Sequence, residues 1–148
     1  MTPPNADKHV LVVEDHPPTA ELLTLSLDEV DPSISSSVVD DGRDCLAVLR
    51  REDGSIPYPD LVFLDLDLPE INGFTVLETT DTDTSFRRIP TLVLSSKDDP
   101  ETVARCYERG ATAFISKPDE LDGFLSIAKT VVDHWFSTIE LPATGQPK

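Results

Sequence analysis

Hydrophobic residues form two kinds of pattern that alternate five times along the chain. Short apolar runs predict strands, and the most continuous of these runs are typical of parallel strands covered on both faces. The predicted strands span residues 9–13, 34–39, 60–65, 89–95 and 111–115. Between them, apolar residues recur at helical spacing and predict helices that begin at Pro17, follow Gly42, span residues 74–80 and 99–109, and run from Leu121 to Trp135. Gly110 suits the position just past the end of the fourth helix.

Five strand–helix repeats predict an α/β fold with right-handed crossovers and a doubly wound sheet. For a chain of 148 residues, the natural candidate is a flavodoxin-like three-layer sandwich whose five parallel strands have the order 2-1-3-4-5. Residues 8–139 form the predicted domain. Residues 1–7 and 140–148 are polar and contain proline, and we expect a disordered N-terminus and a flexible C-terminal tail.

The composition is strongly acidic, with 28 Asp and Glu against 12 Lys and Arg, a net charge of −16. Such a surface should repel nucleic acids and anionic membranes, because binding to phosphate backbones depends on Lys and Arg. We therefore expect neither as a partner. The acidic residues occur in every segment, and this resembles the proteins of halophilic organisms such as haloarchaea. An ordinary acidic cytosolic protein is the alternative.

Several features indicate a cytoplasmic protein. Cys45 and Cys106 lie in predicted helices and form no CxxC motif, which is typical of small buried residues in a reducing compartment. No apolar run approaches the ~18 residues of a membrane span. The N-terminus "MTPPNADK" lacks the basic and then apolar pattern of a signal peptide.

Chemically distinctive residues follow four of the predicted strands. The carboxyl ends of parallel strands meet at one edge of a doubly wound sheet, and ligands bind there beside the switch in strand order. We therefore expect three carboxylates, two hydroxyls and one amine in a single crevice. They belong to Glu14 and Asp15 after the first strand, Asp65 ending the third, Ser95 and Ser96 at the end of the fourth, and Lys117 after the fifth.

Three neighbouring carboxylates repel each other, and one such pair at 4 Å costs about 4 kcal/mol at an effective dielectric constant near 20. A hard divalent cation relieves this repulsion, and an all-oxygen ligand set with room for water suits Mg²⁺. Lys117 balances the cluster from the other side and can neutralise an arriving anion. The group most favoured beside Asp65 is therefore a phosphoryl group, with Ser95 and the amide of Ser96 placed to bind its oxygens.

Four short motifs carry a family resemblance. They are "VVEDH" at 12–16, "LDLDLPEING" at 64–73, "LSS" at 94–96 and "ISKP" at 115–118. With these motifs, residues 8–137 resemble the CheY-like receiver domains of two-component response regulators. The resemblance implies phosphorelay signal transduction, in which the protein catalyses only its own phosphorylation and dephosphorylation and is not otherwise an enzyme.

The resemblance also implies roles for the acidic residues. Asp65 would accept a phosphoryl group from the phosphohistidine of a sensor histidine kinase. Asp15 and Asp65 would bind Mg²⁺ directly, Asp67 would bind it through its main-chain carbonyl, and Glu14 largely through water. The side chain of Asp67 would face the entrance and modulate hydrolysis of the acyl phosphate. Lys97 flanks the same entrance, and we expect it to pair with Asp67.

Further roles concern the switch. Lys117 would contact the phosphoryl group, and the bond from Lys117 to Pro118 is often cis in the family. Ser95 and Phe114 match the family's switch pair: the hydroxyl moves toward the phosphate and the aromatic ring follows inward. The face formed by the fourth helix, fifth strand and fifth helix would then change for protein–protein output.

We expect output through a downstream protein of unknown identity, a homodimer or phosphoryl relay, because no DNA-binding module follows the last helix. That helix ends in "VVDHWFSTIELP" and is apolar beyond one core-facing stripe. This resembles single-domain regulators paired with bacterial phytochromes, which dimerise through this face. The alternative is a simple core helix. The interface candidates are Val132, Trp135, Phe136 and Ile139.

Two other functions remain open. "DLDLP" resembles the nucleophile motif of haloacid-dehalogenase-like phosphatases, although those enzymes carry it after their first strand. A pseudo-receiver that binds partners without taking phosphate is the second alternative, although no required residue is missing.

Overall fold

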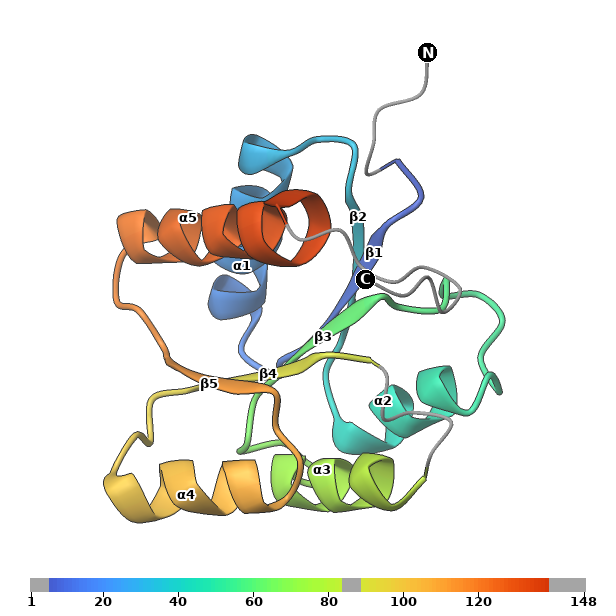
Figure 1. The fold of residues 1–148 in the computed structure, drawn as a ribbon. Helices are drawn as coiled ribbons and strands as arrows, with labels where there is room; N and C mark the ends of the chain where they lie inside the picture. The colour runs from blue at the N-terminus through green and yellow to red at the C-terminus, as the bar shows by residue number, and fades with distance from the viewer. Residues whose placement is uncertain (1–5, 84–88, 139–148) are drawn as a thin grey trace.

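The computed structural model describes residues 6–83 and 89–138 (Figure 1). Five parallel strands form one sheet of order β2-β1-β3-β4-β5. This confirms the predicted doubly wound fold, and every strand end lies within two residues of its predicted position. The strands are β1 (His9–Val13), β2 (Ser35–Val39), β3 (Leu61–Leu64), β4 (Thr91–Ser95) and β5 (Ala113–Ser116).

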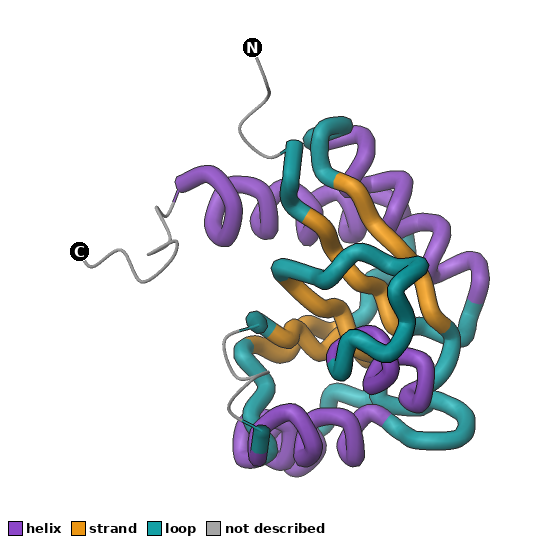
Figure 2. Tube along the Cα trace, turned by 90° about the vertical axis from the view of Figure 1, so that its right-hand side faces the viewer, coloured by secondary structure: helices purple, strands orange, loops and turns teal. Residues whose placement is uncertain are grey.

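Helices cover both faces of the sheet, so the domain has three layers (Figures 1 and 2). Helices α1 and α5 pack on one face and contact each other, whereas α2, α3 and α4 lie on the other. Beyond α5 the chain continues in wider π-helical turns, η1, where a single long α-helix was predicted. The helices are α1 (Pro17–Val30), α2 (Gly42–Leu49), α3 (Gly73–Thr82), α4 (Pro100–Glu108), α5 (Leu121–Thr130) and η1 (Val131–Thr138).

The alternating side chains of the central strands divide the core into two halves. Leu11 and Leu64 pack in the cluster shared with α2 and α3, and Val12 and Phe63 pack in the cluster shared with α1 and α5. All four are at most 1% exposed. Both faces of β1 and β3 are thus closed to water, which explains their continuous apolar runs.

Local signals in the sequence explain the helix ends that surround the site. Asn72 and Asp99 cap α3 and α4 by accepting hydrogen bonds from the backbone N–H groups of Thr75 and Thr102. Gly110 has a φ of 99° and follows α4, as predicted. Its N–H donates to Tyr107 and the next N–H donates to Cys106, the paired bonds of a Schellman motif.

Candidate functional site

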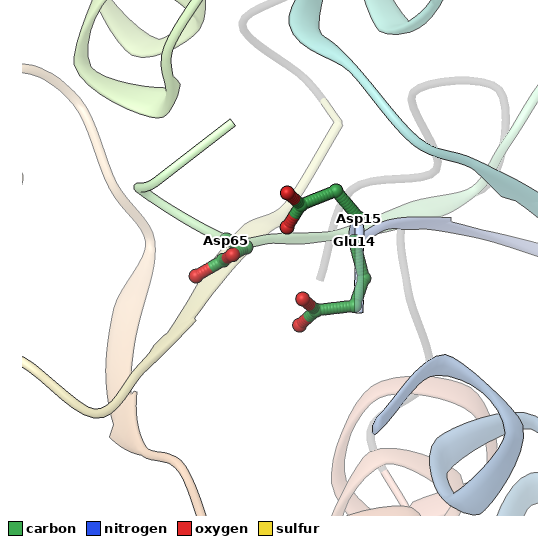
Figure 3. Close-up of side chains that lie close together, drawn as sticks. All are labelled: Glu14, Asp15 and Asp65. Atoms are coloured by element: carbon green, nitrogen blue, oxygen red, sulfur yellow. The ribbon is translucent and has the colours of Figure 1, made fainter. Parts of the chain in front are cut away.

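The carboxyl ends of β1 and β3 place three acidic residues together. The N–H of Asp65 donates to the carbonyl of Val13 over 3.0 Å, and the N–H of Glu14 donates to the carbonyl of Val39 over 3.0 Å. These bonds extend the sheet by one residue and hold the two acidic residues at its rim. Figure 3 shows the carboxylates of Glu14 and Asp15 extending toward Asp65.

The three carboxylates form a compact cluster of oxygen ligands. One oxygen from each of Glu14, Asp15 and Asp65 lies within 4.8 Å of the others. Glu14 and Asp65 are 4% and 6% exposed, whereas Asp15 is exposed, so the cluster is open to solvent on the side of Asp15. This geometry suits a hard cation that keeps some water ligands, and it matches the site predicted from the strand ends.

Lys117 reaches this cluster from β5. Its Nζ lies 3.0 Å from Oε1 of Glu14 and 3.6 Å from Oδ1 of Asp65. The other oxygen of Glu14 accepts the backbone N–H of His16 over 3.2 Å. Both oxygens of Glu14 are therefore engaged by the protein. A buried carboxylate needs partners of this kind, and the amine lies close enough to Asp65 to contact a group attached there.

The bond between Lys117 and Pro118 is trans, so the cis form expected from the resemblance is wrong. The trans form is favoured by about 0.5–1 kcal/mol when no contact demands the other isomer. Lys117 is instead oriented by its own N–H, which donates to the carbonyl of Ser95 over 2.9 Å.

The environment of Asp65 favours its neutral form. Burial raises the pKa of Asp65 to about 7, and the neighbouring charge of Glu14 acts in the same direction. Lys117 and the N–H of Leu66 oppose the rise by stabilising the ionised carboxylate. A bound cation would also oppose the rise, because a nearby opposite charge stabilises the ionised carboxylate. The protonation of Asp65 therefore depends on the charge of any group bound at the site.

The two hydroxyl residues at the carboxyl end of β4 lie at different depths. Ser95 is 1% exposed and its Oγ accepts the N–H of Lys97 over 3.1 Å, whereas Ser96 is exposed at the rim. Asp67 is also exposed. The predicted pair between Lys97 and Asp67 is absent from the ion pairs of the described residues, so that expectation is wrong. Long exposed side chains gain little from such pairing.

Tight backbone packing around the β3–α3 loop was not anticipated. A Cβ at Gly73 would lie 2.4 Å from the carbonyl oxygen of Asp65, and one at Gly42 would lie 1.8 Å from that of Ile71. Arg43 also pairs with Glu70 over 2.9 Å. The spacing of Gly73 after Asp65 was a visible signal, but the approach of α2 to this loop depends on tertiary packing.

Phe114 lies on β5, partly buried against the core cluster on the α2 and α3 side of the sheet. Its backbone N–H donates to the hydroxyl of Tyr107 on α4 over 2.9 Å. The aromatic switch candidate is therefore tied to a neighbouring helix through its main chain, a contact that the sequence did not indicate.

The predicted interface on the last helix is only partly exposed. Val132 is 7% exposed and belongs to the core, so its assignment to an outer patch is wrong. It packs in the same core cluster as residues of α1 and α5. Trp135 and Phe136 are partly buried, and Ile139 lies outside the described residues. An apolar cavity of about 410 Å³ opens beside Trp135 and is lined by Ala113 and Ile115 of β5.

Two further predictions concern the whole chain. Cys45 and Cys106 are buried and free, which confirms that they pack as small apolar residues. Among the described residues, no helix has the length and apolar character needed to cross a membrane.

A comparison of the sequence with known protein families identifies the family of this chain. The sequence profile described as the response regulator receiver domain matches residues 10–129. The chain belongs to this family. The receiver is 28% identical over 143 residues to the response regulator Rcp1 of Synechocystis, covering 94% of this chain and 96% of Rcp1. The membership sets aside the dehalogenase-like phosphatase interpretation, because the acidic motif follows the third strand of a receiver fold.

Solved structures support the same grouping. The receiver resembles the phosphorylated cyanobacterial phytochrome response regulator RcpA with a TM-score of 0.83 and 31% identity, covering 91% of this chain and 98% of RcpA. It resembles the Mn²⁺-bound form of Rcp1 with a TM-score of 0.79 and 27% identity, covering 91% and 99%.

Some relatives are longer proteins. The receiver is 34% identical over 111 residues to the DNA-binding response regulator MtrA of Mycolicibacterium smegmatis, covering 75% of this chain and only 44% of MtrA. Its likeness to MtrA is therefore confined to less than half of that protein.

Proposed function

We propose that the receiver accepts a phosphoryl group on Asp65 from a sensor histidine kinase. The observation that carries this proposal is the position of Lys117, whose Nζ lies 3.6 Å from Asp65 and 3.0 Å from Glu14. A single cation beside a buried acceptor carboxylate can orient and neutralise an incoming anion. The likeness to RcpA, whose solved structure is of a phosphorylated protein, supports the same role.

Mg²⁺ fits the acidic cluster. The donor set consists only of oxygens, and it is open to water beside Asp15. Asp15 and Asp65 would hold the ion directly, together with the main-chain carbonyl of Asp67, and Glu14 would hold it largely through water. The ion would neutralise the crowded carboxylates and the phosphoryl charge. The Mn²⁺-bound structure of Rcp1 supports a divalent cation in a related protein.

The residues of the chain supply the switch in this proposal. A change from 1% to 99% active requires about 5.5 kcal/mol of differential stabilisation. Charge-assisted hydrogen bonds from Lys117 and Ser95 to the new oxygens, at about 1.5–3 kcal/mol each, would supply much of it. The hydroxyl of Ser95 now accepts the N–H of Lys97, and it would donate its own proton to a phosphoryl oxygen. Phe114 would then follow inward.

The output surface in this proposal is the face formed by α4, β5 and α5. Trp135 lies beside an apolar cavity on this face, and Phe136 and Ile139 follow it in the chain. We propose that these residues contribute to a homodimer, and that a downstream protein reads the switched face in the cytoplasm. Light scattering after size-exclusion chromatography tests the dimer, and Trp135→Ala should shift it toward monomer.

Labelling with acetyl phosphate tests the acceptor. Wild-type protein with Mg²⁺ should gain the mass of one phosphoryl group, and a chelator should prevent this. Asp65→Asn should remain unlabelled, whereas the matched control Asp67→Asn, which changes an exposed neighbour, should be labelled. Persistent labelling of Asp65→Asn would refute the assignment. A wild type that is neither labelled nor able to bind beryllofluoride would instead indicate a pseudo-receiver.

A further inference from the structure

Helix α4 has a small apolar anchor. Among its nine residues, only Thr102 and Cys106 are buried. Polar contacts near the surface add to this anchor: the C-cap residue Arg109 pairs with Glu78 of α3 over 2.8 Å, and the guanidinium of Arg105 lies 4.1 Å from the centre of the Phe74 ring. A helix held in this way can shift at small cost, because few buried apolar contacts are lost.

One polar contact joins α4 to the edge of the sheet. β5 is the last strand and pairs only with β4. The N–H of Lys117 donates to Ser95 of β4. Because successive residues of a strand direct their N–H groups to opposite sides, the N–H of Phe114 is directed to the open edge. There it donates to the hydroxyl of Tyr107 over 2.9 Å.

The hydroxyl fixes the outer end of the Tyr107 side chain. Tyr107 is among the exposed large residues, with 49% of the residue exposed, so the ring is only partly covered by the domain. The bond satisfies a strand N–H that would otherwise face solvent, and it joins α4 to β5 at the residue whose ring is the switch candidate. Lys117 lies three residues later, directly after the end of β5.

We propose that Tyr107 is a positioning residue that holds β5 in its resting place and opposes the phosphorylated arrangement. This proposal rests on the proposed function of Asp65. In this proposal the inward shift of Phe114 carries the main chain of β5 away from α4, so that the bond between Tyr107 and Phe114 must lengthen or break. The bond therefore belongs to the resting state and lowers the affinity for the phosphoryl group.

The chain offers a matched pair of variants. Tyr107→Phe removes the hydroxyl and keeps the ring. The protein has two tyrosines, and the hydroxyl of the other, Tyr58, also bonds to the backbone, donating to the carbonyl of Leu49 over 3.2 Å at the end of α2. Tyr58→Phe thus removes a similar bond far from α4. One neutral hydrogen bond changes a conformational equilibrium by roughly 2–10-fold.

The test is a titration of the full chain with beryllofluoride, a phosphoryl mimic, at saturating Mg²⁺, followed by NMR. Tyr107→Phe should bind with a midpoint roughly 2–10-fold lower than the wild type, whereas Tyr58→Phe should match the wild type. Hydrogen exchange of the Phe114 amide should be faster in Tyr107→Phe, and it should also become faster in the wild type when beryllofluoride binds. Thermal melts confirm that each variant is folded.

The outcomes separate the two proposals. A wild type that binds no beryllofluoride overturns the function proposed for Asp65 and the role of Tyr107 with it. A wild type that binds, with Tyr107→Phe binding equally well or more weakly, overturns only the role of Tyr107. Unchanged exchange at Phe114 in Tyr107→Phe also overturns it, because the hydroxyl would then not protect that amide.

Discussion

Asp65→Asn should stabilise the receiver in the absence of divalent cations. Burial and the charge of Glu14 raise the pKa of Asp65 to about 7, so the ionised carboxylate is unfavourable where it lies. Asparagine has nearly the same shape, carries no charge and can still accept the N–H of Leu66, which now donates to Asp65 over 2.9 Å. The substitution therefore removes an electrostatic cost while it keeps the packing and the hydrogen bond.

The direction and the size of this stabilisation follow from the linkage between proton binding and folding. An acid whose pKa is raised by folding binds its proton more tightly in the folded state, so stability falls as pH rises from the unfolded pKa to the folded one. For a shift from 3.8 to about 7, the cost of Asp65 is about 4 kcal/mol at pH 8 and about 2 kcal/mol at pH 5. The stabilisation of the folded state by Asp65→Asn should therefore be larger at pH 8 than at pH 5 by about 2–3 kcal/mol.

Urea denaturation at pH 5 and pH 8 in the presence of a chelator measures this advantage. Asp67→Asn serves as the control, because it removes an exposed negative charge from the same loop. Added Mg²⁺ should stabilise the wild type more than Asp65→Asn, since only the wild type offers the third carboxylate. An advantage that is the same at both pH values, or an Asp65→Asn protein less stable than the wild type at pH 8, would refute the reasoning.

Three further predictions concern the fold. Gly42→Ala should lower the free energy of unfolding, measured with urea, by about 1–3 kcal/mol or more, because its Cβ would meet the carbonyl oxygen of Ile71 at 1.8 Å. Gly54→Ala is the control and should change that free energy little, because a Cβ there would have no atom within 4 Å. Equal effects of the two substitutions would contradict the packing argument. Burial lowers the pKa of His9, so its contribution to stability should be present above pH ~6.5 and lost as pH falls below it; His9→Gln, measured at each pH, should lack this dependence. The net charge of −16 predicts a higher urea midpoint in molar KCl, where charges are screened within about 3 Å; a midpoint that falls with KCl would show that self-repulsion is minor.

Much of the fold and of the site could be predicted because both depend on local patterns. The apolar runs of β1 and β3 indicate strands buried on both faces, and parallel strands bring their carboxyl ends to one edge. Glu14, Asp65 and Lys117 therefore meet although they are far apart in the chain. Contacts between exposed side chains were less predictable. Lys97 and Asp67 are both exposed and form no ion pair among those of the described residues, because solvent competes for both charges.

The sequence alone determined the strand order, the acidic cluster and the amine opposite it, since periodicity and strand ends are properties of short segments. Only the tertiary structure decided how far each helix covers the sheet, which buries Val132 and leaves Tyr107 exposed. It also decided that the hydroxyl of Tyr107 reaches the edge of β5 at Phe114. Such contacts depend on the distance and angle between separately formed elements, and these follow from the packing of the whole core.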